Sequence, residues 1–503
     1  MLLTPAEMRA TEDAAFAAGA TPADLMQQAG SGIAATVQQF LPTPGTLVAF
    51  VAKGHNGGDA LVAARHLQNT GWHVVVRLIG PPADLRPLTR QHLGSLSTPT
   101  DILGESSLAL PGHRLGTPVA ILDGILGIGA TGPLKGAYRI ATSQLNRLRQ
   151  HHHATTFAID LPTGIDSTTG TPSQDAVLAD VTITIAHPKT GLLADTATAH
   201  VGRLAIVPLA ALDTPNCSGA DAVVLTPTIL RPLLPRLPVD AHKGTAGHVG
   251  IIAGSPGLSG AASLSARAAL HAGAGLITLY TPTAAHAAIV AQCPPEVMVK
   301  PLDDLHLALA SEHAALAVGP GLGKAHASEI LELISRANCP LILDADALNI
   351  LADSHLDRLD QRTQPTLLTP HPGEMRRLLG TPITSRLEAA IKLSSRSPLI
   401  TVLLKGARTL ISTSGQPTAY NSTGTPAMAS GGMGDTLTGI AAALAARSTA
   451  PSLHHTACLA SWLHGHAAEI AIASGATSVE SLNASTLTDH LGQAFDHLRN
   501  GSY

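Results

Sequence analysis

Short aliphatic runs alternate with helical patterns along almost the whole chain, and this alternation restricts the fold more than any other feature. A first series of runs occupies 46–52, 73–80, 119–127, 157–162, 180–186 and 202–208. A second series occupies 247–254, 276–282, 316–323, 340–348, 365–371 and 401–407. Strands that alternate with helices are typical of parallel sheets covered by helices on both faces. We therefore predict an α/β protein of two three-layer αβα domains.

Two breaks in the pattern separate the two series. The polar, small-residue segment 209–222 interrupts both periodicities, and the proline-rich stretch 231–238 precedes the second series. A chain of 503 residues is also too long for one ordinary domain. We predict an N-terminal, Rossmann-like domain over 1–215 and a C-terminal domain over 223–503.

The charge balance and the cysteines exclude several classes of protein. The net charge of -4 gives no basic surface for nucleic acid. The cysteines at 217, 293, 339 and 458 show neither metal-ligand nor disulfide spacing, so a reducing cytoplasm is the expected location. No run reaches the ~18 apolar residues of a membrane span. We expect small-molecule partners, no nucleic acid, no membrane and a homo-oligomer whose size the sequence does not specify.

Polar side chains follow several strands of the first series. Asn56 and Asp59 lie in a glycine-containing turn that opens a helix, and Asp123, Asp160 and Thr163 come after later strands. Open α/β sheets bind ligands at the carboxyl ends of their strands, so we expect these side chains to converge. Asn56, Asp123 and Thr163 offer oxygen ligands with too little negative charge for a tight Mg²⁺ site, which favours K⁺. Taken singly, each aspartate is more typical of a cap or a turn, and only the whole set favours a binding site.

The second series ends in a glycine cluster beside an acidic residue. Glycines at 431, 432 and 434 let backbone N–H groups approach an anion, and Asp435 stands at the start of an apolar helix. Lys405 follows another strand and supplies a cation suited to a nucleotide. His371 follows a further strand, and glycines end the run at 316–323. These features predict a site at one sheet edge that handles phosphate.

The ordered motifs of the first half resemble the NAD(P)H-hydrate epimerase family, the YjeF N-terminal domain. The matching motifs are HNGGDA at 55–60, the turn after Asp123, and DLPTGID at 160–166. The resemblance implies that Asn56, Asp123 and Thr163 hold K⁺ and that Asp160 acts as acid and base on the hydrated ring. This sequence differs from the family pattern at Lys53, His55, Ala60 and Thr163. At His55 the resemblance therefore does not specify the side-chain contact to the substrate. The residues implied to bind the hydrated dinucleotide are His55, Asn56, Gly57, Gly58, Asp59, Gly127, Ile128, Gly129, Ala130, Thr131, Gly132, Pro133 and Asp160.

The second half resembles the ribokinase-like superfamily, and within it the ADP-dependent NAD(P)H-hydrate dehydratases. The motifs are HKG at 242–244, VGPGLG at 318–323, LDADALN at 343–349, TPHPGEM at 369–375 and the glycine cluster. The resemblance implies that Asp435 is the catalytic base, that Mg²⁺ screens the phosphates, and that ADP becomes AMP and phosphate. The residues implied to bind the hydrated dinucleotide are Ala262, Gly321, Gly323, His371 and Asp435. Those implied to bind ADP are Lys405, Gly406, Ala407, Arg408, Thr409 and Gly434.

These resemblances predict one bifunctional enzyme for metabolite repair. Its first domain would interconvert the R and S forms of hydrated NADH and NADPH, and its second would dehydrate the S form with ADP. One alternative is a ribokinase-like small-molecule kinase with a noncatalytic N-terminal domain. Another is a dimerisation and RNA-contact module like that of mRNA-decapping scaffolds, which would favour a basic face and would not need Asp160. The residues alone do not choose between ADP and ATP or between NADH and NADPH.

Overall fold

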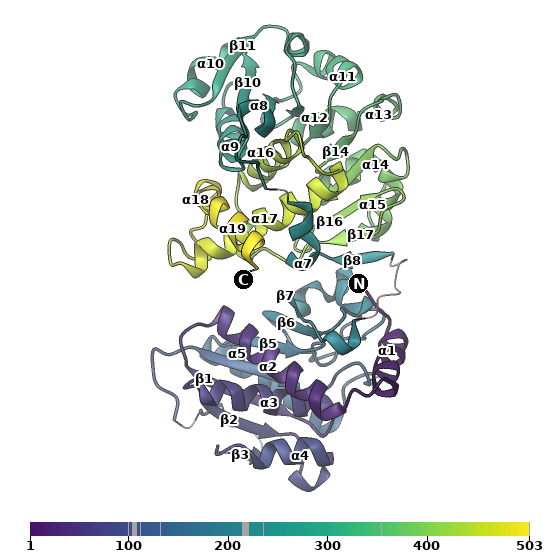
Figure 1. Cartoon of the computed structure of the whole chain (residues 1–503), viewed down its shortest axis with the longest axis vertical. Coiled ribbons are helices and arrows are strands. Elements are labelled where there is room, and N and C mark those ends of the chain that lie inside the picture. The colour runs from purple at the N-terminus through teal and green to yellow at the C-terminus, as the bar shows by residue number, and fades with distance from the viewer. Residues whose placement is uncertain are drawn as a thin grey trace. The chain divides into compact units, whose positions relative to one another are not determined.

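A computed structural model of the chain describes residues 1–501, except 99, 103–107, 111, 131, 214–220, 235 and 354. The chain divides into two compact units, Met1–Ala220 and Asp221–Tyr503. Half of the predicted boundary segment 209–222, the residues 214–220, lies outside the described residues. Each unit has its own sheet (Figure 1) and its own buried core.

The first unit is built on a seven-stranded sheet in which every pair is parallel, in the order β3-β2-β1-β4-β5-β6-β7. Its strands are β1 (Thr46–Val51), β2 (His73–Leu78), β3 (Thr100–Ile102), β4 (Val119–Gly124), β5 (Thr155–Ile159), β6 (Val181–Ile185) and β7 (Arg203–Val207). The order reverses between β1 and β4, which leaves a crevice at their carboxyl ends, where ligands bind in sheets of this kind. The parallel, Rossmann-like sheet predicted for this half is confirmed; the edge strand β3 was not predicted.

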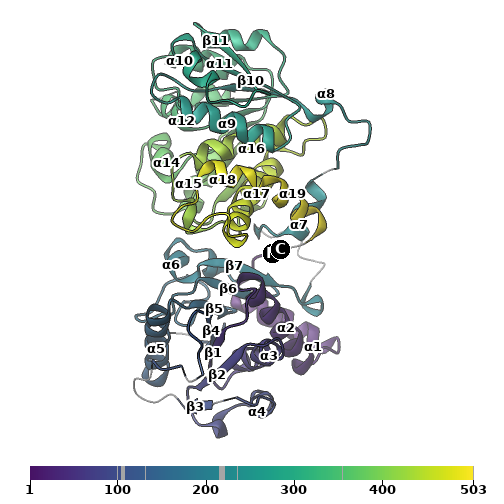
Figure 2. The ribbon, with the colours of Figure 1, turned by 90° about the vertical axis from the view of Figure 1, so that its left-hand side faces the viewer.

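Helices cover both faces of this sheet. They are α1 (Pro5–Ala17), α2 (Pro22–Phe40), α3 (His55–Asn69), α4 (Pro87–Gly94), α5 (Gly136–His152) and α6 (Thr198–Val201). Side chains of α1, α2 and α3 form one core with the sheet, and α5 packs on the opposite face, as Figure 2 shows. The first helix begins at a capping box in which Thr4 and Glu7 bond to each other's backbone N–H groups, followed by proline at the first helical position.

The second unit contains a ten-stranded sheet in the order β11-β10-β9-β12-β13-β14-β15-β16-β17-β8. Its strands are β8 (Ala222–Val224), β9 (His248–Ile252), β10 (Leu276–Pro282), β11 (Met298–Leu302), β12 (Ala315–Val318), β13 (Leu341–Leu343), β14 (Thr366–Leu368), β15 (Ile400–Leu404), β16 (Leu410–Thr413) and β17 (Thr418–Tyr420). This sheet is mostly parallel but mixed, because β16 pairs antiparallel with both β15 and β17. A short turn after β15 returns the chain directly, so no crossover helix intervenes.

Helices again form two layers in this unit. They are α7 (Pro227–Leu230), α8 (Lys243–Ala246), α9 (Ser259–His271), α10 (Thr283–Val290), α11 (Ala327–Arg336), α12 (Ala345–Ala352), α13 (Asp357–Asp360), α14 (Pro372–Leu379), α15 (Arg386–Ser394), α16 (Met433–Ala445), α17 (Leu453–Ala473), α18 (Ala484–Asp489) and α19 (Leu491–Asn500). The core on one face joins α9, α16 and α17 to the sheet, and small residues allow the close packing of α16 on α9. A side chain at Gly439 of α16 would lie 2.1 Å from the carbonyl oxygen of Ser265 in α9. The helices α11, α12, α14 and α15 form the other layer (Figure 1).

Candidate active sites

A cavity of about 550 Å³ lies in the first unit at the point where the strand order reverses. The segments after β1 and β4 line it, and α1 and α2 contribute further walls. Of the predicted dinucleotide-binding residues, those at the cavity are His55, Asn56, Asp59, Gly127, Ile128, Gly129, Ala130 and Asp160. Most of the predicted dinucleotide-binding residues therefore lie together at this cavity.

The remaining predicted residues of this site lie elsewhere. Gly57 and Gly58 are buried and do not line this cavity. A side chain at Gly57 would come within 2.2 Å of the Ala52 carbonyl, so its glycine serves close packing of α3 on the end of β1. Gly132 and Pro133 line a second cavity of about 340 Å³, which shares Leu126 and Ala130 with the first. Thr131 lies outside the described residues.

The three predicted K⁺ ligands surround the backbone that follows β4. The buried carboxylate of Asp123 accepts hydrogen bonds from the Thr163 hydroxyl at 2.7 Å and from the Thr163 amide at 2.8 Å. Asn56 donates to the Leu126 carbonyl at 3.2 Å, and the Leu126 amide donates to the Thr163 hydroxyl at 3.0 Å. Burial raises the pKa of Asp123 to about 6, although the bonds from Thr163 oppose this rise. The set is rich in neutral oxygens with one carboxylate, a chemistry that fits a large monovalent cation.

Asp160 forms an ion pair with a lysine that the sequence reasoning did not select. Lys189 Nζ donates to Asp160 Oδ1, and the side chain of this lysine is only 1% exposed. Asp160 has a left-handed backbone with φ of 66°, which is unusual for a residue other than glycine and occurs often at functional sites.

Two further acids share the cavity with Asp160. Asp59 extends from α3 and Glu12 from α1. Burial, followed by the charges of Asp160 and Glu12, raises the pKa of Asp59 well above its ordinary value. Burial, and then Asp160, also raises the pKa of Glu12. His55 stands 3.2 Å from Arg86, and burial together with that guanidinium lowers the pKa of His55.

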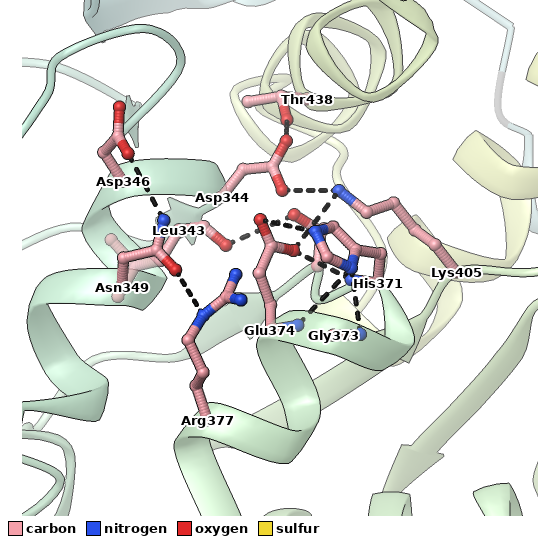
Figure 3. A network of polar contacts seen from close by, with 11 residues as sticks. Leu343, Asp344, Asp346, Asn349, His371, Gly373, Glu374, Arg377, Lys405 and Thr438 are labelled. Atoms are coloured by element: carbon pink, nitrogen blue, oxygen red, sulfur yellow. Dashed lines mark hydrogen bonds and ion pairs between the residues drawn. The ribbon is translucent and has the colours of Figure 1, made fainter. Parts of the chain in front are cut away.

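In the second unit, polar side chains meet where β13 and β15 end (Figure 3). Lys405 follows β15 and donates to Asp344, which follows β13, at 2.7 Å; it also lies 3.9 Å from Glu374. Thr438 of α16 donates to the other oxygen of Asp344 at 2.8 Å. Burial opposes the charge of Lys405, but Asp344 and Glu374 outweigh it and raise the pKa of this lysine. These contacts hold the positively charged ammonium of Lys405 at the edge of the sheet.

The glycine cluster brings the start of α16 to this lysine. Gly432 caps the helix with φ of 85°, a conformation suited to glycine, and a side chain at Gly434 would lie 3.2 Å from Lys405 Nζ. Asp435 is in the first turn and has no hydrogen-bond partner among the described residues. Burial, and then the charge of Asp344, raises the pKa of Asp435 to about 6. A carboxylate that titrates close to neutral pH is suited to accept a proton.

His371 and Glu374 lie after the end of β14, at the start of helix α14. His371 Nδ1 accepts from the amides of Gly373 and Glu374, and the Glu374 carboxylate accepts from the His371 amide, which makes a capping box for α14. Burial, followed by the charge of Lys405, lowers the pKa of His371. The predicted run at 340–348 likewise ends early, because Asp344 precedes α12.

The other predicted residues of the second site surround the same sheet edge. Gly321 and Gly323 have left-handed backbones after β12, and the Gly323 amide donates to Asp346 at 2.7 Å. Ala262 lies in α9 and is fully buried, so its methyl group belongs to the core. In the predicted ADP-binding segment, Gly406 and Ala407 are exposed, the Thr409 hydroxyl donates to the Gly406 carbonyl, and Arg408 is buried.

Comparisons with known proteins identify the family of each half of the chain. Residues 249–490 match a family described as NAD(P)H-hydrate dehydratase, and residues 22–191 match the YjeF-related protein N-terminus. The bifunctional NAD(P)H-hydrate repair enzyme of Moorella thermoacetica is 36% identical over 502 residues, which cover 93% of this chain and 92% of that protein. The chain belongs to the bifunctional NAD(P)H-hydrate repair enzymes.

Other members are similarly close. The repair enzyme of Coxiella burnetii is 34% identical, with 96% of this chain and 97% of that protein covered. A solved structure of ADP/ATP-dependent NAD(P)H-hydrate dehydratase from Bacillus subtilis, co-crystallised with ATP and Mg²⁺, is 31% identical. The structural match covers 54% of this chain and 97% of the Bacillus subtilis chain, with a TM-score of 0.48.

Membership of the repair enzyme family confirms the predicted family and disfavours the kinase alternative. Within the described parts of the chain, no helix is long and apolar enough to cross a membrane. The residues that sequence reasoning missed in this repair enzyme are Glu12, Lys189, Asp344, Glu374 and Thr438. Two signals could have found some of them: Asp344 and Glu374 belong to recognised motifs, and Lys189 follows a strand in the sequence HisProLys.

Proposed function

We propose that the two units carry out consecutive repair steps on hydrated NADH and NADPH. The first unit interconverts the R and S forms, and the second dehydrates the S form with ADP as co-substrate. The observation that supports this most strongly is the position of Asp435: a carboxyl whose pKa is about 6 begins a glycine-capped helix beside the lysine that Asp344 holds. That arrangement combines a proton acceptor with amides and a cation suited to phosphate.

In the first unit, we assign substrate binding to the residues that line the larger cavity, and acid and base chemistry to Asp160. The ring hydroxyl gives its proton to Asp160, a carbonyl forms as the ring carbon–nitrogen bond breaks, and the nitrogen takes up a proton. Closure on the other face of the carbonyl reverses each transfer and inverts the carbon. Asp59 is suited to supply the second proton, because burial raises its pKa well above the ordinary value and so favours the protonated form. K⁺ held by Asn56, Asp123 and Thr163 would supply a fixed positive charge that orders the loop after β4.

In the second unit, Asp435 removes the hydroxyl proton of the S form, and the oxygen attacks the terminal phosphorus of ADP. AMP leaves, and the phosphorylated carbon–oxygen bond then breaks with the help of the ring nitrogen. Loss of a ring proton gives NAD(P)H, with AMP and phosphate as the other products. Lys405, Gly406, Ala407, Arg408, Thr409 and Gly434 form the proposed ADP site.

In this scheme the binding of Mg²⁺ depends on the phosphate oxygens of the nucleotide. The described residues contain no group of three or more His, Cys, Asp or Glu side chains that could hold a metal ion. Asp344 and Glu374 are already engaged by Lys405. The donors present therefore fit an ion bound mainly through phosphate oxygens, where it would screen their charge.

One assay tests the whole proposal. The purified chain is supplied with an R and S mixture of hydrated NADPH, Mg²⁺, K⁺ and either ADP or ATP, and reduced nicotinamide absorbance, AMP and phosphate are followed. We expect full recovery of NADPH, with one AMP and one phosphate for each molecule repaired when ADP is the co-substrate. A phosphorylated dinucleotide that accumulates would support the kinase alternative. Epimerisation would be refuted if NADPH recovery stopped once the S form was consumed and the R form then reacted no faster than it does without enzyme.

The location and assembly are part of the proposal. The described cysteines, Cys293, Cys339 and Cys458, are free thiols, which suits a reducing cytoplasm. A homo-oligomer stays a prediction, and light scattering on the purified chain would test it.

A further inference from the structure

Two neighbouring strands of the first unit end in the same backbone turn. Asp160 follows β5 with φ of 66°, and Ala186 follows β6 with φ of 57°. In both turns the next amide donates back to the carbonyl of the last strand residue at 2.8 Å, and a proline comes directly after it. Because β5 and β6 are parallel neighbours, the repeated turn places two short segments side by side at one edge of the sheet. The first segment carries Asp160, and the second carries Lys189.

The backbone of Lys189 is fixed by the start of the chain. Leu3 forms a parallel β-bridge with Lys189, in which the Leu3 amide donates to the Pro188 carbonyl and the Thr190 amide donates to the Leu3 carbonyl. The ammonium has three acceptors: Asp160 Oδ1, the Thr184 hydroxyl at 3.3 Å and the Ile185 carbonyl at 3.1 Å. A lysine with three N–H donors is therefore fully engaged within the protein.

The two oxygens of Asp160 have different surroundings. Oδ1 accepts from Lys189, from the Ile185 amide at 3.2 Å and from the Thr184 hydroxyl at 3.5 Å. Oδ2 accepts no hydrogen bond from the described residues and faces the cavity loop, since a side chain at Gly127 would lie 3.8 Å from it. The same added atom would lie 3.7 Å from the Asn56 side chain. One oxygen is anchored, and the other is left for the substrate.

We propose that Lys189 is a positioning residue for epimerisation, which holds Asp160 by Oδ1 so that Oδ2 is presented to the hydroxyl of the hydrated ring. This inference rests on the proposed function of the first unit. The charged and titratable groups that surround Asp160 are Lys189 after β6, Asp59 of α3 and Glu12 of α1. Of these three carboxyl groups, Asp160 is the one that contacts the Lys189 ammonium among the described residues.

If the ion pair between Lys189 and Asp160 were purely structural, a different result would be expected. Its loss would lower stability and leave the pH dependence and the turnover of the surviving protein unchanged. A positioning lysine acts on kcat, because its contribution is to the proton transfer and not to substrate binding. It also acts only through Asp160, so its effect disappears when the carboxylate is removed.

The experiment uses the full chain, whose dehydratase reports on its epimerase. With excess ADP, the S form of a racemic mixture is consumed quickly, and the R form follows at the rate of epimerisation above the enzyme-free rate. We expect Lys189→Met to slow the second phase about 100-fold in kcat with little change in KM. Lys189→Gln keeps an N–H donor without the charge, and we expect it to restore part of kcat while the acidic limb of the pH profile moves to higher pH. Lys135→Met, at an exposed lysine of the same unit, is the matched control and should leave both phases unchanged.

The double variant completes the test. Asp160→Asn with Lys189→Met should be no slower than Asp160→Asn alone, because the two residues act as one unit. Multiplicative losses would overturn the inference, as would normal kcat in Lys189→Met. If Lys189→Met does not fold, as judged by its melting profile, Lys189→Gln decides: an unchanged pH profile would overturn the inference. Failure of the unaltered chain to consume the R form would instead refute the proposed function.

Discussion

Each unit places a lysine–carboxylate pair at the carboxyl edge of its sheet, but the two pairs are buried in opposite ways. In the first unit the lysine side chain is 1% exposed and that of Asp160 is 12% exposed. In the second unit the carboxylate is the inner partner, with Asp344 at 2% and Lys405 at 20%. The outer partner is the one a ligand can reach. The first unit thus presents an anion suited to proton transfer, and the second presents a cation suited to a nucleotide.

The largest effect should come from Asp435, the carboxylate of the second unit that does not belong to the Lys405–Asp344 pair. Asp435→Asn removes the proposed base, and we expect dehydration to fall about 1,000-fold while epimerisation is unchanged. NADPH recovery from the S form alone measures dehydration, and chromatographic exchange between the two forms measures epimerisation. Full dehydration by Asp435→Asn would show that the base is another group, with Asp344 the nearest candidate.

Lys405→Met should affect binding more than turnover, in contrast to Lys189→Met. The loss of a charge-assisted contact to the nucleotide should raise KM for ADP about 30-fold. The same change leaves Asp344 buried without its cation, so the unfolding free energy should fall by roughly 3 kcal/mol. Steady-state kinetics at varied ADP and urea unfolding provide the two measurements. Lys392→Met, at an exposed lysine of α15, is the control; a fall in kcat alone would contradict the binding role of Lys405.

The pH dependence of dehydration should follow Asp435. Burial and Asp344 raise the pKa of this residue to about 6, and only the ionised form accepts a proton. The base form is therefore lost as the pH falls through about 6, and kcat/KM should decrease about tenfold for each pH unit below that value. A profile on the S form between pH 5 and 8 tests this, and a rate that stays flat down to pH 5 would contradict it.

The smallest effects should come from the threonines that support each pair. Thr438 donates to Asp344, and Thr184 lies between Lys189 and Asp160. Thr438→Val and Thr184→Val each remove one buried hydroxyl, and each should lower the unfolding free energy by roughly 1 kcal/mol. Thr184→Val should also slow epimerisation severalfold, and Thr438→Val should slow dehydration only. Crossed effects, with either variant slowing the reaction of the other unit, would show that the sites are not independent.

The sequence predicts the buried strands well and the sheet edges poorly. Runs such as 276–282 coincide with a strand because strands covered on both faces are continuous in aliphatic residues. The edge strand β3 is exposed throughout, and β8 and β17 have three residues each, so none of them leaves a strong hydrophobic pattern. The antiparallel turn into β16 likewise carries no signal of its own in a series that otherwise favours crossovers.

The sequence brings side chains together correctly where one motif carries them, and it misses a partner that lies far along the chain. His55, Asn56, Asp59 and Asp160 line one cavity as expected, because each follows a strand that ends at the same edge. Lys189 lies 29 residues after Asp160, and only the repeated turn of two adjacent strands shows that they meet. Gly57 and Gly58 illustrate the opposite error, since close packing and ligand approach both require glycine.

The pairing of Leu3 with Lys189 makes the first residues of the chain part of the epimerase. The family match of this unit begins at residue 22, so a shortened protein designed from that match would lack both Leu3 and Glu12. Such a protein would keep Asp160 and every residue implied by the family motifs, yet it would lose the strand contact that holds the lysine. Bulky affinity tags joined directly to Met1 would disturb the same contact, so a carboxyl-terminal tag is the safer choice for measuring epimerisation.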